Sequence, residues 1–309
     1  MKLQAREITT GLRFPEGPIA LPDGSVLVVE IEGARLVRCT MDGGKDVVAE
    51  LGGGPNGAAM GPDNHVYVCN NGGFNWITDN AFGPGFLRPH GKADNYHNAG
   101  IQRVDLATGK VEMLYTHCGD TPITGPNDIV FDGRGGFYFT DHGKTYGRVM
   151  DRGAIFYAAE DGSAITEVVF GMITPNGVGL SPDGKTLYAS ETETGRVWAW
   201  PILSPGVVAK DPWPSPAGGR FIGGPTGYQR FDSMAIEENG NICVASLVRG
   251  GISVFSPEGG LVEFHEAPEP YCTNICFGGA DRKTAFITLS GYGRLVAVDW
   301  PRAGLKLAY

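Results

Sequence analysis

Six side chains that carry oxygen atoms occupy equivalent positions in a repeated sequence phrase. The phrase is clearest at residues 175–184, PNGVGLSPDG, where Pro and Asn are followed by Gly, an apolar run and a turn. Aligned on that Asn, the copies place these residues in register: Glu16, Asn56, Asn127, Asn176, Asp232 and Asn274. A repeat of this kind is typical of a fold built from one recurring unit, so we expect each unit to present one of these side chains.

The residues between successive phrases indicate β-strands. Each phrase is followed by β-branched and aromatic runs between Gly, Asp and Asn turns, as in VLVVE at 26–30, TLYAS at 186–190 and RLVAVD at 294–299. Fourth strands are visible at 46–51, 110–116, 166–170 and 261–266, but the last repeat has no clear fourth strand. Residues 3–12 could supply it. The sequence therefore predicts an all-β, six-bladed β-propeller with four-stranded blades, closed by an N-terminal strand.

We expect residues 1–309 to form a single domain in which two insertions break the repeat, at 72–99 and at 203–230. The first contains several aromatic residues among Gly and Pro, which makes it a candidate lid or pocket wall; the alternative is a loop that packs on its own surface. The second is rich in Pro and Gly and carries Trp213 and Tyr228.

Composition limits the classes of partner. The formal net charge of −9 argues against nucleic acid, because phosphate binding depends on clustered Lys and Arg. No apolar run approaches the ~18 residues of a membrane span, and no signal segment is visible, so we expect a cytoplasmic protein that does not bind membranes. The six cysteines lack zinc spacing and are expected to be small buried side chains, although Cys272 and Cys276 could pair.

The repeated position suggests a metal site. In a propeller the innermost strands line the central channel, so the six side chains should form a ring at one mouth. Two carboxylates, Glu16 and Asp232, at ~5 Å would repel by about 3 kcal/mol at an effective dielectric of ~20, and a cation between them would relieve this. Oxygen ligands suit Ca²⁺, Mg²⁺ or Mn²⁺. The alternative is that these residues cap strand ends, which is the preferred interpretation for Asn274.

The chain resembles the senescence marker protein/gluconolactonase family, which includes regucalcin-like lactonases and is distantly similar to diisopropylfluorophosphatase. The resemblance covers nearly the whole chain and is carried by FPEGP at Phe14, TGPND at Thr124, TPNG at Thr174, SPDG at Ser181 and the segment 231–234. It implies metal ligands at Glu16, Asn176 and Asp232, with Asn127 as ligand or substrate contact. It also implies one divalent cation, with Ca²⁺ expected first and Zn²⁺, Mn²⁺ or Fe²⁺ as alternatives. Phe231 and Ser233 replace the Pro and Gly that usually flank the family's aspartate.

The ends of the second strands should reach the same mouth. Asn70, Asn71 and His142 are the expected substrate contacts there, and Asp141, Tyr146, Arg148 and Glu191 lie in similar places. His142 has an ordinary pKa suited to proton transfer near neutral pH, although a surface or supporting role is the preferred interpretation.

These residues lead to a hypothesis of metal-dependent hydrolysis of a sugar lactone or similar small lactone. The cation would polarise the carbonyl, and Asp232 would act as general base on water. No covalent nucleophile motif is present. The alternatives are an aryl-ester or organophosphate hydrolase on the same site, and a non-catalytic binding propeller stabilised by metal. We expect a monomer or a weak homo-oligomer.

Overall fold

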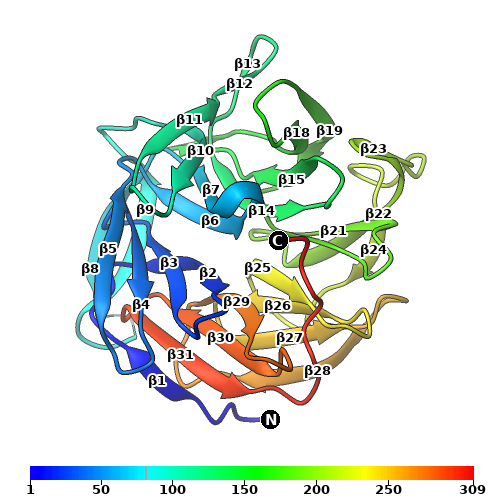
Figure 1. The fold of residues 1–309 in the computed structure, drawn as a ribbon. Helices are drawn as coiled ribbons and strands as arrows, with labels where there is room; N and C mark the ends of the chain where they lie inside the picture. The colour runs from blue at the N-terminus through cyan, green and yellow to red at the C-terminus, as the bar shows by residue number, and fades with distance from the viewer. Residues whose placement is uncertain (81) are drawn as a thin grey trace.

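The computed structural model describes residues 1–80 and 82–309, and it confirms the β-propeller (Figure 1). Six antiparallel sheets surround a central axis, and each is one blade whose first strand lies innermost. Helical structure in the described part is a single 3-10 turn, η1 (Pro62–Asn64). A membrane span would need a long apolar helix, and the described residues provide none.

Blades one to three follow the order that the repeat predicts. Blade one contains β2 (Pro15–Ala20), β3 (Val26–Glu30), β4 (Arg35–Cys39) and β5 (Lys45–Glu50). Blade two contains β6 (Pro55–Met60), β7 (His65–Asn70), β10 (Gly100–Asp105) and β11 (Val111–Tyr115). Blade three contains β14 (Pro126–Phe131), β15 (Gly136–Asp141), β18 (Gly153–Ala159) and β19 (Ile165–Met172).

Blades four to six complete the circle. Blade four contains β20 (Pro175–Leu180), β21 (Thr186–Glu191), β22 (Arg196–Ser204), β23 (Val207–Val208) and β24 (Arg220–Gly223). Blade five contains β25 (Phe231–Ile236), β26 (Ile242–Ser246), β27 (Gly251–Phe255) and β28 (Leu261–Glu266). Blade six contains β29 (Cys272–Gly278), β30 (Thr284–Leu289), β31 (Arg294–Asp299) and β1 (Arg6–Thr9). The N-terminal strand therefore closes the ring, as predicted.

The 203–230 insertion is more regular than the sequence indicates. Both β23 and β24 pair with the long strand β22, so the outer edge of blade four is built from two short pieces inside this segment. The four residues of β24 are too few to show an alternating pattern, and the Pro and Gly around them hide the strand. The Gly- and Pro-rich composition correctly indicated turns, but it hid the two short strands that form the outer edge of blade four.

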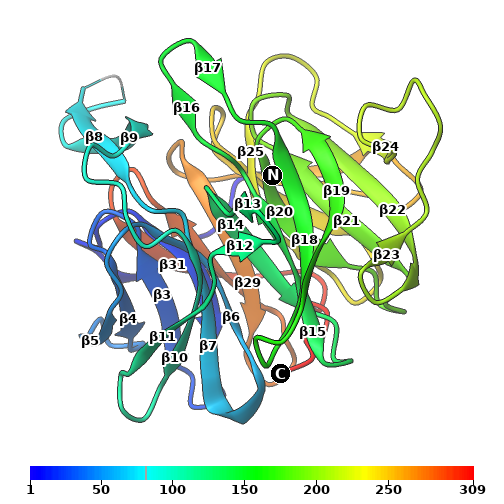
Figure 2. The same ribbon diagram turned by 90° about the horizontal axis from the view of Figure 1, so that it is seen from above.

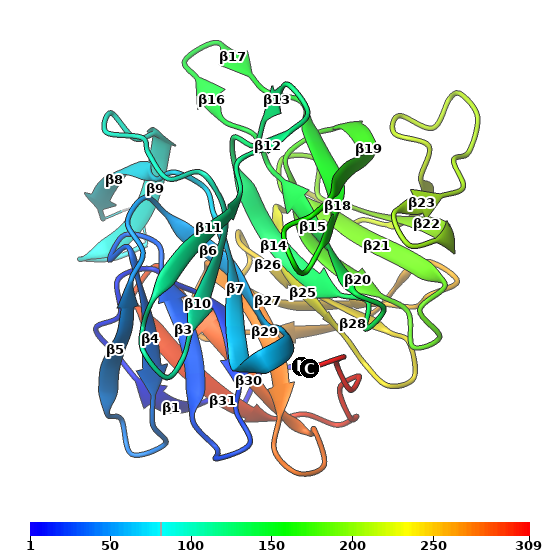
Figure 3. The ribbon, with the colours of Figure 1, turned by 45° about the horizontal axis from the view of Figure 1, so that its top comes forward.

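Three further hairpins lie outside the blades. They are β8 (Phe74–Asp79) with β9 (Phe86–Lys92), β12 (His117–Cys118) with β13 (Thr121–Pro122), and β16 (Thr145–Tyr146) with β17 (Val149–Met150). Hairpins β8–β9 and β16–β17 project from one face of the propeller, and the C-terminus lies at the opposite face (Figure 2). In the tilted view β16–β17 stands at the top and β8–β9 at the upper left (Figure 3).

The hydrophobic core is divided among the interfaces between blades. Each of six clusters of buried side chains draws on two adjacent blades. The second strands are buried along almost their whole length, and β3 and β26 entirely so, because a blade covers each of their faces. The six cysteines are free thiols, four of them buried, so Cys272 and Cys276 do not pair.

The closing strand should contribute measurably to stability. Ile8 on β1 is buried against blades one and six. We expect Ile8→Ala to lower the free energy of unfolding by about 2–5 kcal/mol, because it removes buried methyl groups and leaves a cavity. Urea unfolding followed by fluorescence measures this. The exposed Arg6→Ala variant on the same strand is the control, expected within about 0.5 kcal/mol of wild type. Equal stability of the two variants would contradict a closing role for β1.

Candidate active site

The structure brings the six repeated side chains to one mouth of the channel, where the inner strands begin. In every blade the pairing of first and second strands shifts register at this point. A bulge re-aims side chains, and in four blades the repeated residue has no partner in the ladder, whereas Glu16 pairs with Val29 and Asn274 with Thr288. Five of the residues are buried, and Asp232 is partly exposed. The closeness of the first and last blades is direct, since Asn274 Nδ2 donates to Glu16 Oε2 at 2.7 Å.

Glycine after the repeated residue allows the inner strands to converge. A Cβ on Gly57 would lie 2.3 Å from the carbonyl oxygen of Asn127, and one on Gly17 would lie 2.8 Å from that of Asn56. Both distances are shorter than any van der Waals contact. A larger residue at either position would therefore push neighbouring blades apart at the axis.

Two carboxylates predicted from the repeat share this confined space. Glu16 Oε2 also accepts the Gly17 amide at 2.9 Å, yet burial raises the pKa of Glu16 to about 7. Burial, and then the negative charge of Glu16, raise the pKa of Asp232 well above its ordinary value. The two groups therefore destabilise each other's charged forms, as the sequence indicated.

A third carboxylate, Asp128, was missed by the sequence analysis. It is buried beside Asn127, and burial followed by the charge of Glu16 raises its pKa to about 7. The signal was present in the repeat, because Asp128 stands where three other copies carry Gly17, Gly57 and Gly177. The other two copies carry Ser233 and Ile275, so Asp128 is the one acidic residue at this position of the repeat.

The amides complete an oxygen-rich site. Asn176 Nδ2 donates to Thr192 Oγ1 at 3.0 Å, which leaves Oδ1 on the other side, where Ser233 Oγ lies 3.3 Å away. Asn127 Oδ1 is buried and has no hydrogen-bond partner among the described residues. No three His, Cys, Asp or Glu side chains in that part of the chain lie together as a metal site would require. A cation here would therefore depend on the amide oxygens as well as the carboxylates.

Hairpin β8–β9 forms an aromatic wall at this mouth. Trp76 lies 4.9 Å, between ring centroids, from Phe14 of blade one, and Phe86 lies 5.0 Å from Tyr271 at the start of blade six. On the other side, Tyr96 donates its hydroxyl hydrogen to the Thr124 carbonyl of blade three at 2.7 Å. The 72–99 insertion thus packs on neighbouring blades instead of on its own surface.

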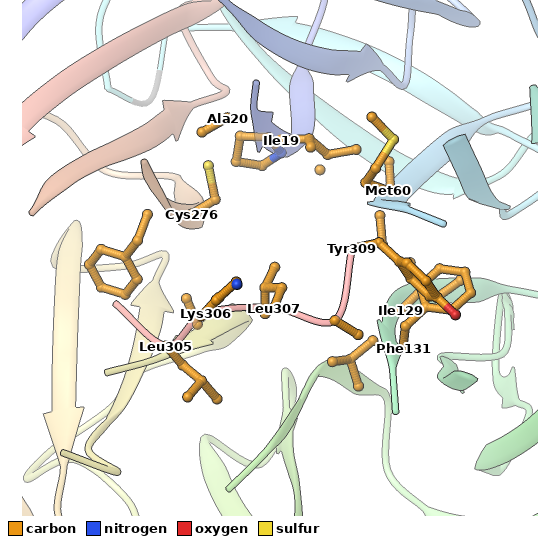
Figure 4. A pocket seen from close by; sticks show the side chains of 18 of the residues that line it. Ile19, Ala20, Met60, Ile129, Phe131, Cys276, Leu305, Lys306, Leu307 and Tyr309 are labelled. Atoms are coloured by element: carbon orange, nitrogen blue, oxygen red, sulfur yellow. The ribbon is translucent and has the colours of Figure 1, made fainter. Parts of the chain in front are cut away.

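The opposite mouth has a different character. A cavity of 1070 Å³ lies there, lined mostly by apolar side chains of the inner strands and by the C-terminal residues Leu305 to Tyr309. Ile19, Met60, Phe131, Cys276 and Leu307 surround its open centre in Figure 4. Since Asp128 and Asn274 also line this cavity, it reaches the inner side of the ring. We nevertheless assign the candidate active site to the mouth at which hairpin β8–β9 lies, here called the hairpin mouth, because of the unpaired Asn127 amide and the polar loops there.

Comparison with known proteins decides the family. The family model described as SMP-30/Gluconolactonase/LRE-like region matches residues 14–291. The chain belongs to this family. The match begins at Phe14, two residues before Glu16, and ends within blade six, so all six repeated residues lie inside it.

Individual relatives either have low sequence identity to this chain or match only part of it. A gluconolactonase of Zymomonas mobilis is 25% identical over 312 residues, covering 92% of this chain and 78% of that protein. A lactonase drp35 of Staphylococcus saprophyticus is 35% identical over 133 residues, covering 43% of this chain; the chain spans only 39% of that relative.

Two solved structures share the fold. A gluconolactonase of Xanthomonas campestris aligns with a TM-score of 0.72 at 21% identity, over 96% of this chain and 91% of that one. A calcium-binding protein, regucalcin, of Agrobacterium tumefaciens aligns with a TM-score of 0.74 at 18% identity, over 99% of both chains. At these identities the likeness establishes the family fold and nothing finer.

The side chains at the ends of the second strands mostly form hydrogen bonds with the backbone of loops. Asn70 Oδ1 accepts the Gly54 and Gly72 amides, and its Nδ2 donates to Gly52 and Gln102. Asp141 likewise accepts three backbone amides, and Glu191 accepts the Ile173 amide and the Trp198 indole. These side chains hold the loop that enters each repeat. Asn70, expected to contact substrate, is therefore committed to the backbone.

Asn71 is placed differently. Its Oδ1 accepts the Gly73 amide at 2.9 Å and the ammonium group of Lys144 at 3.1 Å. Two donors on one oxygen fix the orientation of the amide, and the buried Nδ2 has no partner within the described residues. Lys144 was not identified from the sequence. It is buried, lies 3.9 Å from the centre of the Phe74 ring, and burial lowers its pKa to about 7.

The other candidates have mixed positions. His142 is partly buried, and burial, together with the positive charges of Lys144 and Arg230, lowers its pKa to about 4. It is therefore neutral at physiological pH. Tyr146 donates to Asp151 Oδ2 at 3.0 Å on the exposed β16–β17 hairpin, and Arg148 is exposed there.

The raised carboxylate pKa values predict how stability responds to pH. The ordinary pKa of Glu16 is 4.5 and its folded value is about 7. Between these values the folded state holds a proton that the unfolded state has released, so stability falls as pH rises through this window. We expect the melting temperature of chelator-treated protein to fall between about pH 5 and pH 8.

A divalent cation added at pH 8 should restore the melting temperature, because it would stabilise the charged carboxylates. Glu16→Gln removes one titrating group, and it should flatten the pH dependence and weaken the response to cation. A melting temperature of the chelated wild type that is constant or rises over this window would contradict the coupling of these carboxylates.

Proposed function

We propose that this protein hydrolyses a small lactone and depends on one divalent cation for activity. The observation that carries the proposal is the buried, unpaired Oδ1 of Asn127 in the ring of repeated residues, in a member of the gluconolactonase family. In the same region burial raises the pKa of Glu16, Asp128 and Asp232, and the charge of Glu16 adds to the shift at the two aspartates. A buried acceptor without a donor, next to uncompensated negative charge, is the environment that a cation satisfies.

The residues present fit a cation that prefers oxygen ligands. Glu16, Asn127, Asn176 and Asp232 would hold it, and Asn274 would fix Glu16 through their hydrogen bond. When bound, a divalent cation supplies Lewis-acid polarisation of the lactone carbonyl and stabilises the negative charge that develops on its oxygen. Carboxylate and amide oxygens favour Ca²⁺, and the fold is shared with a calcium-binding protein. Zn²⁺, Mn²⁺ and Fe²⁺ are the alternatives that the reloading experiment below compares.

Asp232 is the proposed general base. It is the most exposed of the ring side chains, so a water molecule can reach its carboxylate. One carboxylate oxygen takes a proton from the attacking water as the new C–O bond forms. The same proton passes to the ring oxygen of the lactone as the acyl C–O bond breaks, and a hydroxy acid results.

The neighbouring amide side chains would orient the substrate. Asn71 presents Nδ2 as a donor, because Gly73 and Lys144 occupy its oxygen, and a carbonyl or hydroxyl oxygen of the substrate is the fitting acceptor. Neutral His142 can accept or donate a hydrogen bond with a substrate hydroxyl, but its lowered pKa makes it a weaker base than the sequence suggested. Asn70 is not proposed as a substrate contact, because its side chain is hydrogen-bonded to the backbone.

A lactone panel tests the proposal. Hydrolysis of sugar and aliphatic lactones is followed by proton release, with chelated enzyme and with enzyme reloaded with Ca²⁺, Mn²⁺, Zn²⁺ or Fe²⁺. We expect activity to vanish on chelation and return with one cation. Asp232→Asn should lower kcat by about 10²–10⁴-fold, the range typical of a general base. Asn70→Asp, Lys144→Arg and similar changes are unsuitable controls because they disturb the loops; Arg6→Ala is suitable.

The control result and the contrary outcomes are distinct. Arg6 lies on the exposed outer strand, so its variant should keep wild-type activity. Turnover that survives chelation would contradict metal dependence, and absence of turnover on every lactone with every cation would contradict the lactonase assignment. Phenyl acetate belongs in the same panel, because the aromatic wall of Phe14, Trp76 and Tyr271 also suits an aryl ester.

A further inference from the structure

The hairpin mouth is chemically asymmetric. Blades one and six carry the aromatic rings of Phe14 and Tyr271, which pack with hairpin β8–β9. Blades two, three and five carry nitrogen groups instead. These belong to Asn71 after β7, to His142 and Lys144 after β15, and to Arg230 before β25. We call the latter set the nitrogen arc.

Arg230 lies at the candidate active site. It directly precedes β25, two residues before Asp232, and the side chain between them, Phe231, packs into the core against Phe255 with 5.6 Å between ring centroids. The Arg230 guanidinium pairs with Glu193 of blade four, and its charge acts on both Asp232 and His142, so it stands near both of these side chains.

The guanidinium is held in place but is not fully used. Its Nη2 pairs with Glu193 on the neighbouring blade, and both side chains of that pair are partly exposed, with 30% and 40% accessibility. Its Nε is buried and has no hydrogen-bond partner among the residues described. Arginine carries five N–H donors, so donors remain for a ligand.

Unpaired donors gather in this arc. Asn71 Nδ2 and Arg230 Nε are both buried and unpartnered within residues 1–80 and 82–309. The Lys144 ammonium group donates hydrogen bonds to two neutral oxygens, Asn71 Oδ1 and, at 3.2 Å, the Gly73 carbonyl. The charges that act on His142, those of Lys144 and Arg230, are both positive. Donors and positive charge together are complementary to an anionic oxygen group.

We propose that the nitrogen arc is a subsite for a carboxylate carried by the substrate, bound by Arg230 and Asn71, so that the preferred substrates are acidic lactones. This inference rests on the proposed function, because the lactone carbonyl must lie at the ring while the carboxylate reaches the arc. Arginine suits the task, since its planar fork matches the two oxygens of a carboxylate. The aromatic wall faces the apolar side of the same substrate.

Two matched lactones test the subsite. D-galactono-1,4-lactone and D-galactaro-1,4-lactone share ring and stereochemistry, and the second carries a carboxylate in place of a hydroxymethyl group. We expect the metal-loaded enzyme to prefer the acidic lactone in kcat/KM. Arg230→Gln should lower kcat/KM for the acidic lactone by roughly 10- to 100-fold more than for the neutral lactone, mainly through KM, because losing the charge beside Asp232 affects both substrates alike.

The matched control removes the same charge at the other mouth. Arg38 pairs with Asp23 on blade one, and Arg38→Gln should leave both substrates unaffected. Arg230→Lys, which keeps the charge, should recover part of the loss for the acidic lactone. An equal loss on both lactones in Arg230→Gln would show a merely structural role and overturn the subsite.

A binding measurement separates this inference from the proposed function. Calorimetric titration of the metal-loaded protein compares galactarate, which has two carboxylates, with galactonate, which has one. We expect galactarate to bind at least about tenfold more tightly, and Arg230→Gln to abolish the difference. That result without turnover would support the subsite and reject the lactonase. Turnover with no preference in either experiment would support the lactonase and reject the subsite.

Discussion

The structure depends on the close approach of six strands at one axis. Gly17 and Gly57 allow it, because a single added carbon at either position would collide with the backbone of the next blade. The approach has an electrostatic consequence. Side chains that are far apart in sequence are forced into one small volume, and the carboxylates among them cannot all be charged without a counter-ion. Packing at the axis and chemistry at the mouth are therefore two results of one constraint.

Hydroxyl groups of the second strands stabilise this arrangement between blades. Thr140 donates to the Asn176 carbonyl, and Ser190 donates to the Asp232 carbonyl at 2.7 Å. Each bond joins the second strand of one blade to the ring residue of the next. The backbone of the site is thereby fixed by neighbouring blades, so the side chains of the ring remain available for a ligand.

The mouth also contains strained backbone that the hairpin wall supports. Phe14, Thr174 and Tyr271 adopt φ values of 57°, 49° and 58°, immediately before inner strands. Such conformations cost on the order of 1–3 kcal/mol each for residues other than glycine. Phe14 and Tyr271 are held by ring contacts with Trp76 and Phe86. The aromatic insertion thus helps to keep the entrances to blades one and six in shape.

The repeat made much of this predictable. The fold, the closing strand and the placing of Glu16, Asn127, Asn176 and Asp232 at one mouth follow from a phrase with fixed spacing. The cation, the catalytic roles, the oligomeric state and the cytoplasmic location remain predictions. What the sequence concealed lies outside the phrase or breaks its pattern. Strand β24 is too short to show periodicity, and the burial of Lys144 depends on a hairpin contributed by another blade.

The closure of blade six by β1 has a consequence for biosynthesis. Glu16 is made early and Asn274 is made late, yet they are hydrogen-bonded across 258 positions of the chain. As a ribosome extends the polypeptide, the early blades can collapse against each other, but the first strand has no partner until β31 emerges. Until then the interface between blades one and six cannot form, and Ile8 and its neighbours remain exposed. The nascent protein is thus most vulnerable to aggregation just before its site can assemble.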